Sequence, residues 1–168
     1  MDKKFLRKFG IKIQSLSNNT HLFEFEFDQK LLYQFNSDID ISDSKGTCKI
    51  ILLKTEMMLD VTFEIKGITT LICDRTLKNY THKLDFSKKI LFKFGEEDEE
   101  ISDEMIVINR GKSILNISKF IYEFFILEIP IKRLHPSIKN EDNIDNFVYK
   151  TRTTKRIDPR LESLKKLK

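Results

Sequence analysis

The order of apolar and polar positions predicts strands over the first two thirds of the chain. Phe9, Ile11 and Ile13 alternate with small or polar residues, and Phe then alternates with Glu over positions 23–27. A period of two places alternate side chains on opposite faces of a sheet. We therefore expect the second stretch to be a strand with one aromatic face and one acidic face.

Local signals predict a short helix and a loop after that strand. Asp28 is a typical N-cap for a short helix with Leu31, Leu32 and Phe35 facing inward. The segment 36–46 is rich in Ser and Asp and is expected to be a loop. From Gly46 onward, apolar residues occupy successive positions, so that both faces of the expected strand are apolar. This pattern predicts a strand buried on both faces.

Three more strands are expected before residue 110. Positions 59–66 alternate strictly, Gly67 is expected to break this strand, and 68–73 resumes it. Positions 83–94 form another long alternating stretch, and 105–108 a short one. Short connections between successive strands are typical of an antiparallel meander.

One convincing helix is predicted near residue 117, where the period changes to that of an α-helix. Asn116 is the natural N-cap and Pro130 stops the helix. Five residues are expected on one face of this helix: Ile117, Phe120, Ile121, Phe124 and Leu127. Because Phe125 and Ile126 add further apolar side chains, the whole helix is expected to be nearly buried against the sheet.

The elements together predict an α+β fold. We expect an antiparallel, curved or barrel-like sheet packed by one main helix over residues 1–136, followed by an extended basic tail over 137–168. Within that tail, Asp158 and Pro159 resemble the start of a short terminal helix, because an N-cap precedes a proline at the first helical position.

Charge is distributed unevenly along the chain. The formal net charge is +4, but residues 1–20 carry +4 and residues 147–168 carry +6, so the stretch between them carries −6. Basic ends that flank an acidic middle indicate an anionic partner for the termini, although basic tails also serve solubility alone.

The compartment is predicted to be the cytoplasm. Two cysteines do not make a disulfide framework, and the N-terminal residues MDKKFLRKFG lack the apolar run of a signal peptide. Charges and Pro130 interrupt the longest apolar stretch, so we expect no membrane span and no membrane partner.

Candidate chemistry is sparse. Cys73-Asp-Arg-Thr76 lacks the second cysteine of a zinc-binding pair, so a structural cysteine at a strand end is favoured over a metal ligand. His21, His82 and His135 are interpreted as surface histidines. The acidic run 96–104 is interpreted as a solvated loop, against a Mg²⁺ site or a mimic of nucleic acid. We therefore predict no catalytic residue, no metal and no cofactor.

Two features are candidates for contact with RNA. The Phe-rich strands are better explained by core burial than as stacking platforms. The basic tail is the better candidate, because flexible cations suffice to bind phosphate. Arg75, in the turn at a strand end, is the candidate contact from the folded body. The predicted RNA-binding residues of the tail are Lys150, Arg152, Lys155, Arg156 and Arg160.

The order of these motifs resembles the YceD-like family of large ribosomal RNA accumulation proteins. The Phe9–Leu16 strand precedes His21-Leu-Phe-Glu-Phe, and a later strand leads into Cys73-Asp-Arg-Thr-Leu77, which is similar to the family's C-[DQ]-R-C-L. Leu127-Glu-Ile-Pro130 matches its L-x-[LI]-P ending, with His135 shortly after. Asp158-Pro-Arg through Leu167 resembles its D-P-R-x-x-x-L-x-x-L tail. The residues carrying these motifs are Cys73, Asp74, Arg75, Leu77, Pro130, His135, Asp158 and Pro159.

The resemblance implies a non-enzymatic factor that supports accumulation of large-subunit ribosomal RNA and ribosome assembly. Its expected partners are large-subunit rRNA or its precursor, a ribosomal or assembly protein, or both. Thr76 replaces the family's second motif cysteine, which puts any metal role of relatives in doubt here. Two alternatives stay open: a protein-only interaction adaptor and a metal-dependent RNA-processing enzyme.

Overall fold

The structure is a computed structural model that describes residues 3–36 and 41–139. The chain divides between His135 and Pro136 into two units, which are described separately. The described part of the second unit is one helical turn, α4 (Pro136–Lys139). The predicted tail contacts and the predicted terminal helix lie outside the described residues.

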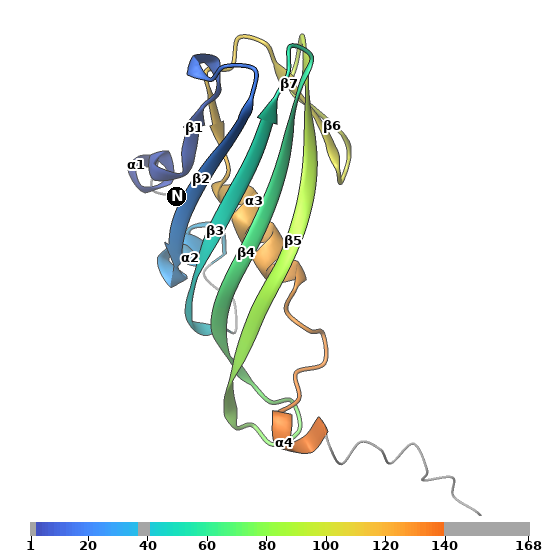
Figure 1. The fold of residues 1–168 in the computed structure, drawn as a ribbon. Helices are drawn as coiled ribbons and strands as arrows, with labels where there is room; N and C mark the ends of the chain where they lie inside the picture. The colour runs from blue at the N-terminus through green and yellow to red at the C-terminus, as the bar shows by residue number, and fades with distance from the viewer. Residues whose placement is uncertain (1–2, 37–40, 140–168) are drawn as a thin grey trace, which may run out of the picture. The chain divides into compact units, whose positions relative to one another are not determined.

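The first unit is built on an open six-stranded sheet, in which four long strands lie side by side (Figure 1). The strand order is β2-β3-β4-β5-β7-β6. The α+β prediction is confirmed. The sheet is not closed into a barrel, because its two edge strands, β2 and β6, do not pair with each other. The bounds are β2 (Thr20–Asp28), β3 (Ser42–Lys54), β4 (Met58–Ile72), β5 (Asn79–Gly95), β6 (Glu99–Ser102) and β7 (Met105–Asn109).

The prediction of a purely antiparallel sheet is wrong at one pair of strands. β2 to β5 form an antiparallel meander, but β7 pairs parallel to β5, with Leu91 opposite Met105. The chain after β5 first forms the acidic β6 and then inserts β7 between β5 and β6. The more apolar strand thus takes the inner position, and the charged strand takes the exposed edge, where charge disfavours further pairing. The predicted acidic loop is therefore strand over Glu99–Ser102.

The N-terminal segment forms a small second sheet that the sequence did not predict. β1 (Gly10–Lys12) pairs antiparallel with β8 (Ile114–Asn116). Short helical turns flank β1, so the predicted alternating strand is only three residues long, although its apolar side chains are buried. The turns are α1 (Lys3–Leu6), η1 (Arg7–Phe9) and η2 (Ile13–Ser15).

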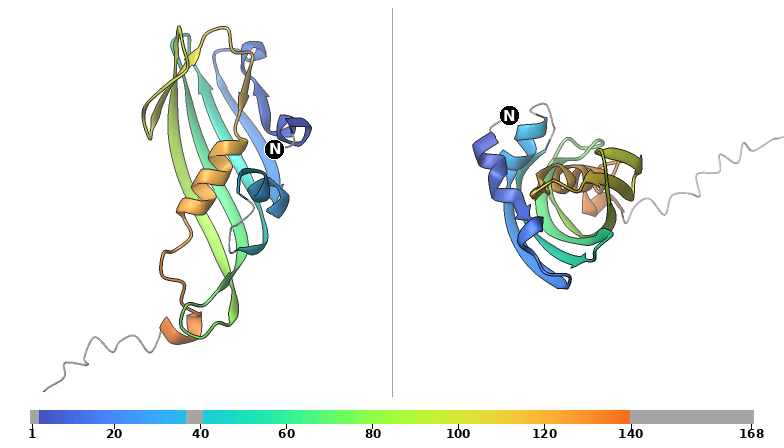
Figure 2. Two further views of the ribbon diagram at one scale, coloured as in Figure 1. Left: turned by 180° about the vertical axis from the view of Figure 1, so that it is seen from behind. Right: turned by 90° about the horizontal axis from the view of Figure 1, so that it is seen from above.

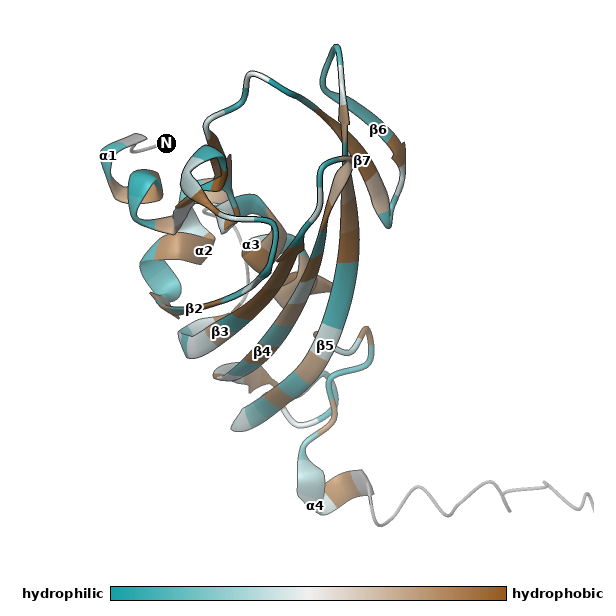
Figure 3. Ribbon diagram, turned by 45° about the horizontal axis from the view of Figure 1, so that its top comes forward, coloured by the Kyte–Doolittle hydropathy of each residue, from teal (hydrophilic) through white to brown (hydrophobic). Residues whose placement is uncertain are grey.

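The core lies between the concave face of the sheet and helix α3 (Ser118–Leu127), which crosses this face and lies in front of the strands in the left view of Figure 2. The alternating hydropathy of β4 and β5 is visible along their ribbons (Figure 3). Phe63 of β4 lies 5.3 Å, ring centre to ring centre, from Phe124 of α3. The predicted helix is confirmed and Phe125 is fully buried, but the expected burial of Leu127 is wrong, because its side chain is 75% exposed. Ile117 takes the N-cap position that was predicted for Asn116. The side chain of Asn116, one residue earlier, accepts a hydrogen bond from the Ser118 N–H at 2.9 Å.

β3 begins earlier than expected and is buried on one face only. The loop predicted over 36–46 is wrong for residues 42–46, which pair with β4 as part of β3. Gln29 and Thr69 form hydrogen bonds with the polar Ser44 of this segment. Gln29 belongs to the predicted helix α2 (Gln29–Phe35), whose Asp28 cap is confirmed by its bond to the Lys30 N–H. Further along β3, Leu53 is 41% exposed, which contradicts burial on both faces.

Gly67 does not interrupt β4. It lies opposite Gly46 of β3, and both positions are crowded by aromatic rings. A Cβ at Gly46 would lie 2.7 Å from Phe27, and one at Gly67 would lie 3.2 Å from Phe125. The two glycines thus make room for the edge-to-face contact of those rings, whose centroids are 5.5 Å apart.

Candidate nucleic-acid interface

The Cys73–Leu77 motif forms the tight turn that joins β4 to β5. The Cys73 N–H donates to the Lys78 carbonyl at 3.0 Å, and the Leu77 N–H donates to the Cys73 carbonyl at 2.8 Å. Leu77 has φ of 56°, a left-handed conformation that is costly for a residue with a Cβ. The two bonds therefore hold a strained turn at the end of the longest strand pair.

The segment after α3 is hydrogen-bonded to this turn. The Asp74 N–H donates to the Arg133 carbonyl at 2.8 Å, and the Arg133 N–H donates to Asp74 Oδ2 at 2.7 Å. The His135 N–H donates to Cys73 Sγ at 3.3 Å, and the His135 ring meets Tyr80 edge-on at 5.8 Å. Figure 1 shows this segment running from α3 to the ends of β4 and β5. We call residues 73–78 and 130–135 together the motif tip.

Cys73 occupies an unusual electrostatic environment at the motif tip. A hydrogen bond from the Thr76 side chain lowers the pKa of the thiol to about 7, against the opposing effect of burial. Backbone N–H groups of His135, Thr76 and Arg75 add to the lowering, because hydrogen bonds to a thiolate favour the charged form. Burial instead raises the pKa of Cys48 to about 12, so Cys73 is the thiol that ionises near neutral pH.

The outward surface of the motif tip is basic and partly apolar. Arg75, Lys78 and Lys132 are exposed, and Arg133 is half-buried. Leu77 is 78% exposed, between Arg75 and Lys78 on one segment. The hydrogen bonds between the two segments therefore bring cations from distant parts of the sequence to the same end of the sheet. Such a surface attracts phosphate, and it offers apolar side chains for contact with bases or with a partner.

The predicted site residues divide into three groups. Cys73, Asp74, Arg75, Leu77 and His135 are brought together at the motif tip, and Pro130 begins its second segment. The tail residues, with Asp158 and Pro159, lie outside the described residues. The acidic residues of the run 96–104 are all exposed. In residues 3–36 and 41–139, no three acidic, His or Cys side chains are grouped so as to hold a metal ion.

Sequence reasoning missed the residues that join the two motif segments. The local sequence does not distinguish Arg133, whose backbone completes the paired bonds with Asp74, and it does not show that Lys78 and Lys132 lie on the same surface. Nothing in the local sequence signals the pairing, because a backbone–carboxylate contact between residues 59 positions apart depends on how α3 is placed. The basic pair Lys132-Arg133 just after Pro130 was the available hint.

Comparison with known proteins agrees with the motif order. The profile of the family described as Large ribosomal RNA subunit accumulation protein YceD matches residues 61–168, more than half of the chain. The chain belongs to the YceD family. The match contains both segments of the motif tip, whereas the first sixty residues, which also suggested the resemblance, lie outside it.

A curated relative extends the similarity toward the N-terminus. The chain is 29% identical over 154 residues to the uncharacterized protein YlbN of Bacillus subtilis (strain 168), covering 85% of this chain and 87% of that protein. No solved structure matches the chain. Membership of the YceD family implies a role in accumulation of large-subunit ribosomal RNA, and this family is not a known enzyme family. None of the helices in the described ranges has the length and apolar character to cross a membrane.

Proposed function

We propose that this protein is a non-enzymatic cytoplasmic factor that supports large-subunit rRNA accumulation by contacting rRNA phosphate with its motif tip and basic tail. One observation carries the proposal: two family motif segments are joined by hydrogen bonds in a way that presents Arg75, Lys78 and Lys132 at one end of the sheet. The predicted contacts Lys150, Arg152, Lys155, Arg156 and Arg160 extend the basic surface along the sequence.

The outer face of the sheet differs from the motif tip, because its positive and negative charges balance. Its charges come in equal numbers across β2 to β5, and opposite charges lie directly opposite or diagonal to each other in the register. Lys66 pairs with Asp85 at 3.0 Å, and Lys89 with Asp60 at 2.7 Å. A face neutralised in this way attracts phosphate weakly. The six carboxylates and six lysines on this face are Glu24, Glu26, Asp28, Asp60, Glu64, Asp85, Lys45, Lys49, Lys66, Lys83, Lys89 and Lys93.

The proposal is tested by measuring the affinity of the full chain for a transcript of large-subunit rRNA precursor over a range of salt concentrations. One variant replaces Arg75, Lys78 and Lys132 with Gln. A second replaces the five tail cations with Gln. The matched control replaces three exposed lysines of the outer sheet face with Gln: Lys45, Lys49 and Lys93.

Both test variants are expected to bind more weakly and to show a shallower dependence of affinity on salt. Removing one phosphate contact reduces the slope of log K against log salt by about 0.7–0.9. The outer-face control should retain the affinity and the slope of the unmodified chain. Unchanged binding in the motif-tip variant would exclude the motif tip as an RNA contact. Unchanged binding in both variants would exclude the proposal.

A further inference from the structure

A second surface, independent of the motif tip, lies between α3 and the β6–β7 hairpin. Two adjoining hollows of about 690 and 480 Å³ share Asp103, Phe124 and Leu127 in their walls. One wall is α3 and the other is the hairpin, and residues of β5 also line both hollows. We call this continuous depression the α3 groove.

The floor of the α3 groove is apolar and rigidly held. Phe120 contacts Phe92 of β5 at 5.4 Å between ring centres, and Phe124 contacts Phe63 of β4 at 5.3 Å. The two phenylalanines of α3 are therefore fixed from the core side while they line the groove. Leu127 on the α3 wall is 75% exposed, and Ile101 on the hairpin wall is 56% exposed. Facing apolar side chains of this size are typical of a docking surface.

The rim of the α3 groove is acidic. Four carboxylates line it, those of Glu100, Asp103, Glu104 and Glu123. Lys119 bridges Glu100 at 3.5 Å and Glu123 at 3.4 Å, and these carboxylates raise its pKa.

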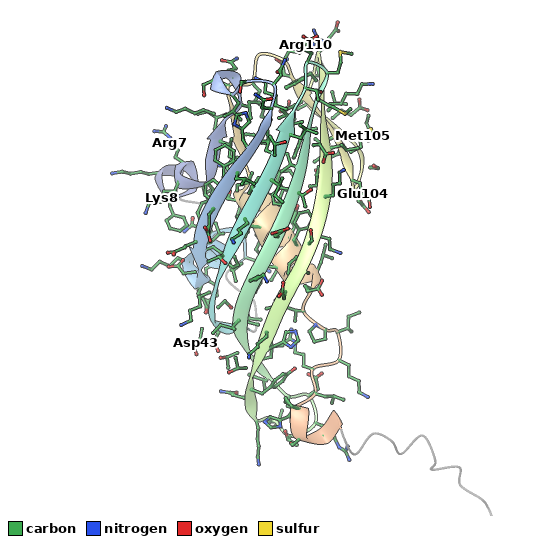
Figure 4. All side chains as sticks on the ribbon, in the orientation of Figure 1. Arg7, Lys8, Asp43, Glu104, Met105 and Arg110 are labelled. Atoms are coloured by element: carbon green, nitrogen blue, oxygen red, sulfur yellow. The ribbon has the colours of Figure 1, made fainter. Side chains whose placement is uncertain are left out.

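The lysines of the groove do not neutralise the acidic rim. Three lysines line the groove, but Lys89 is paired with Asp60, which lies outside it. Lys88 and Lys119 are left to balance the four carboxylates. Within the described residues, Asp103 and Glu104 form no ion pair, and Glu104 lies beside Met105 at the start of β7 (Figure 4). Two negative charges in excess favour a positively charged occupant.

The hairpin edge is unsuited to adding a strand. β6 is four residues long, its register with β7 shifts between Glu100 and Ser102, and its side chains are exposed and partly acidic. Short, irregular and charged edges disfavour strand pairing. An apolar groove with exposed leucine and isoleucine on facing walls instead suits the apolar stripe of a helix.

We infer that the α3 groove binds a basic amphipathic helix of a partner protein, with its apolar stripe on Phe120, Phe124 and Leu127 and its Lys or Arg side chains on the acidic rim. This surface uses none of the motif-tip residues. Binding of protein at the α3 groove and binding of RNA at the motif tip therefore succeed or fail separately.

The first test uses the full chain and a fluorescein-labelled designed peptide of about 18 residues, long enough to form several helical turns. Leu residues occupy one face of the peptide and Lys residues flank them. Two further peptides carry Glu in place of Lys or a scrambled order of the same residues. Anisotropy titrations measure each affinity, and the Leu/Lys peptide is expected to bind most tightly.

Matched variants decide whether the peptide occupies the α3 groove. Leu127→Lys is expected to weaken binding about tenfold or more, because it removes an apolar anchor and adds a repelling charge. Leu22→Lys alters an equally exposed leucine on the outer face, 73% exposed, and should leave affinity unchanged. A double variant with Asp103→Asn and Glu104→Gln should bind the peptide more weakly and with less dependence on salt. The control double variant, with Glu96→Gln and Glu97→Gln, should change neither. Equal effects of the two leucine variants, or preference for the Glu peptide, would overturn the inference.

The second test identifies the occupant in cells. A photocrosslinking amino acid replaces Leu127 in one strain and Leu22 in another, and crosslinked peptides are sequenced by mass spectrometry. The inference expects position 127 alone to capture a segment of another protein with apolar residues at helical spacing and flanking Lys or Arg. Capture of residues 140–168 of the same chain, of a second copy, of RNA, or of no basic helix would each overturn it.

Discussion

The backbone N–H of His135 donates to Sγ of Cys73 at 3.3 Å, although the two residues are 62 positions apart in sequence. With the paired bonds between Asp74 and Arg133, this contact fixes the segment after α3 on the turn between β4 and β5. The motif tip is therefore one structural unit made from two pieces of sequence. Breaking the hydrogen bonds between the two segments is expected to change the arrangement of cations on both segments.

Removing the carboxylate of Asp74 should loosen the contact between the two segments. Asp74→Ala deletes the acceptor of the Arg133 N–H and is expected to lower the free energy of unfolding by about 1–2 kcal/mol. Asp85→Ala is the control, because its exposed ion pair with Lys66 contributes about 0–1 kcal/mol. Urea denaturation measures both, and hydrogen exchange should show faster exchange at Arg133 in the first variant only. Equal stability of the two variants would contradict the assigned role of Asp74.

Ionisation of Cys73 should make stability depend on pH. The pKa of this thiol is about 7 in the folded protein, below the ordinary value of 9.0 that applies to the unfolded chain. The unfolded chain therefore holds the proton over a range in which the folded protein has released it. The resulting stabilisation is fully present above pH 9.0 and is lost as the pH falls through about 7.

Two measurements check the Cys73 prediction. The difference in unfolding free energy between the unmodified chain and Cys73→Ala should grow as the pH rises from about 7 to 9.0. Ultraviolet absorbance of the thiolate should titrate near neutral pH, and Thr76→Val should move the pKa upward by removing the side-chain hydrogen bond. A pH-independent difference, or no shift in Thr76→Val, would show that the thiol stays neutral.

Substitution of Leu77 by glycine should show whether the leucine side chain contributes to binding or to stability. Its φ of 56° is unfavourable for leucine and easily adopted by glycine, so Leu77→Gly is expected to change stability little or raise it by up to about 1 kcal/mol. The same change removes a side chain that is 78% exposed at the motif tip. If Leu77 contacts the partner, binding falls while thermal stability is maintained. A marked loss of stability would instead mean that the side chain packs against the protein.

Gly46 and Gly67 should tolerate substitution unequally. A Cβ at Gly46 would lie 2.4 Å from the Lys66 carbonyl oxygen, whereas the nearest atom at Gly67 is 3.0 Å away. Gly46→Ala must displace backbone, and is expected to cost about 3 kcal/mol or more, with a smaller loss for Gly67→Ala. Gly111→Ala is the control, because there the nearest atom belongs to the side chain of Asn109. Thermal denaturation of the three variants should rank Gly46→Ala as least stable.

Local patterns in the sequence were sufficient for most elements. The alternation over 59–66 predicted a half-buried strand, and β4 buries Leu59, Val61, Phe63 and Ile65 completely. Asp28 marked the start of α2, and the single change of period marked α3. These predictions succeeded because backbone geometry and a one-sided core impose periodicity on each element separately.

Predictions failed where the outcome depended on a neighbouring element. Gly67 looks like a strand breaker, yet it continues β4, and Phe125 lies against the position that a Cβ there would occupy. Polar residues at 42–46 look like a loop, yet they pair with β4. The parallel pairing of β5 and β7 likewise leaves no local signature.

The sequence by itself determined the class of fold, the main strands and helix, and the motifs of the YceD family, because these depend on residues close together in the chain. Only the tertiary structure decided that the segment after α3 meets the Cys73 turn, and that a groove with an acidic rim opens beside Leu127. Both features depend on where α3 lies against the sheet. That position results from the packing of many side chains at once, which no local pattern encodes.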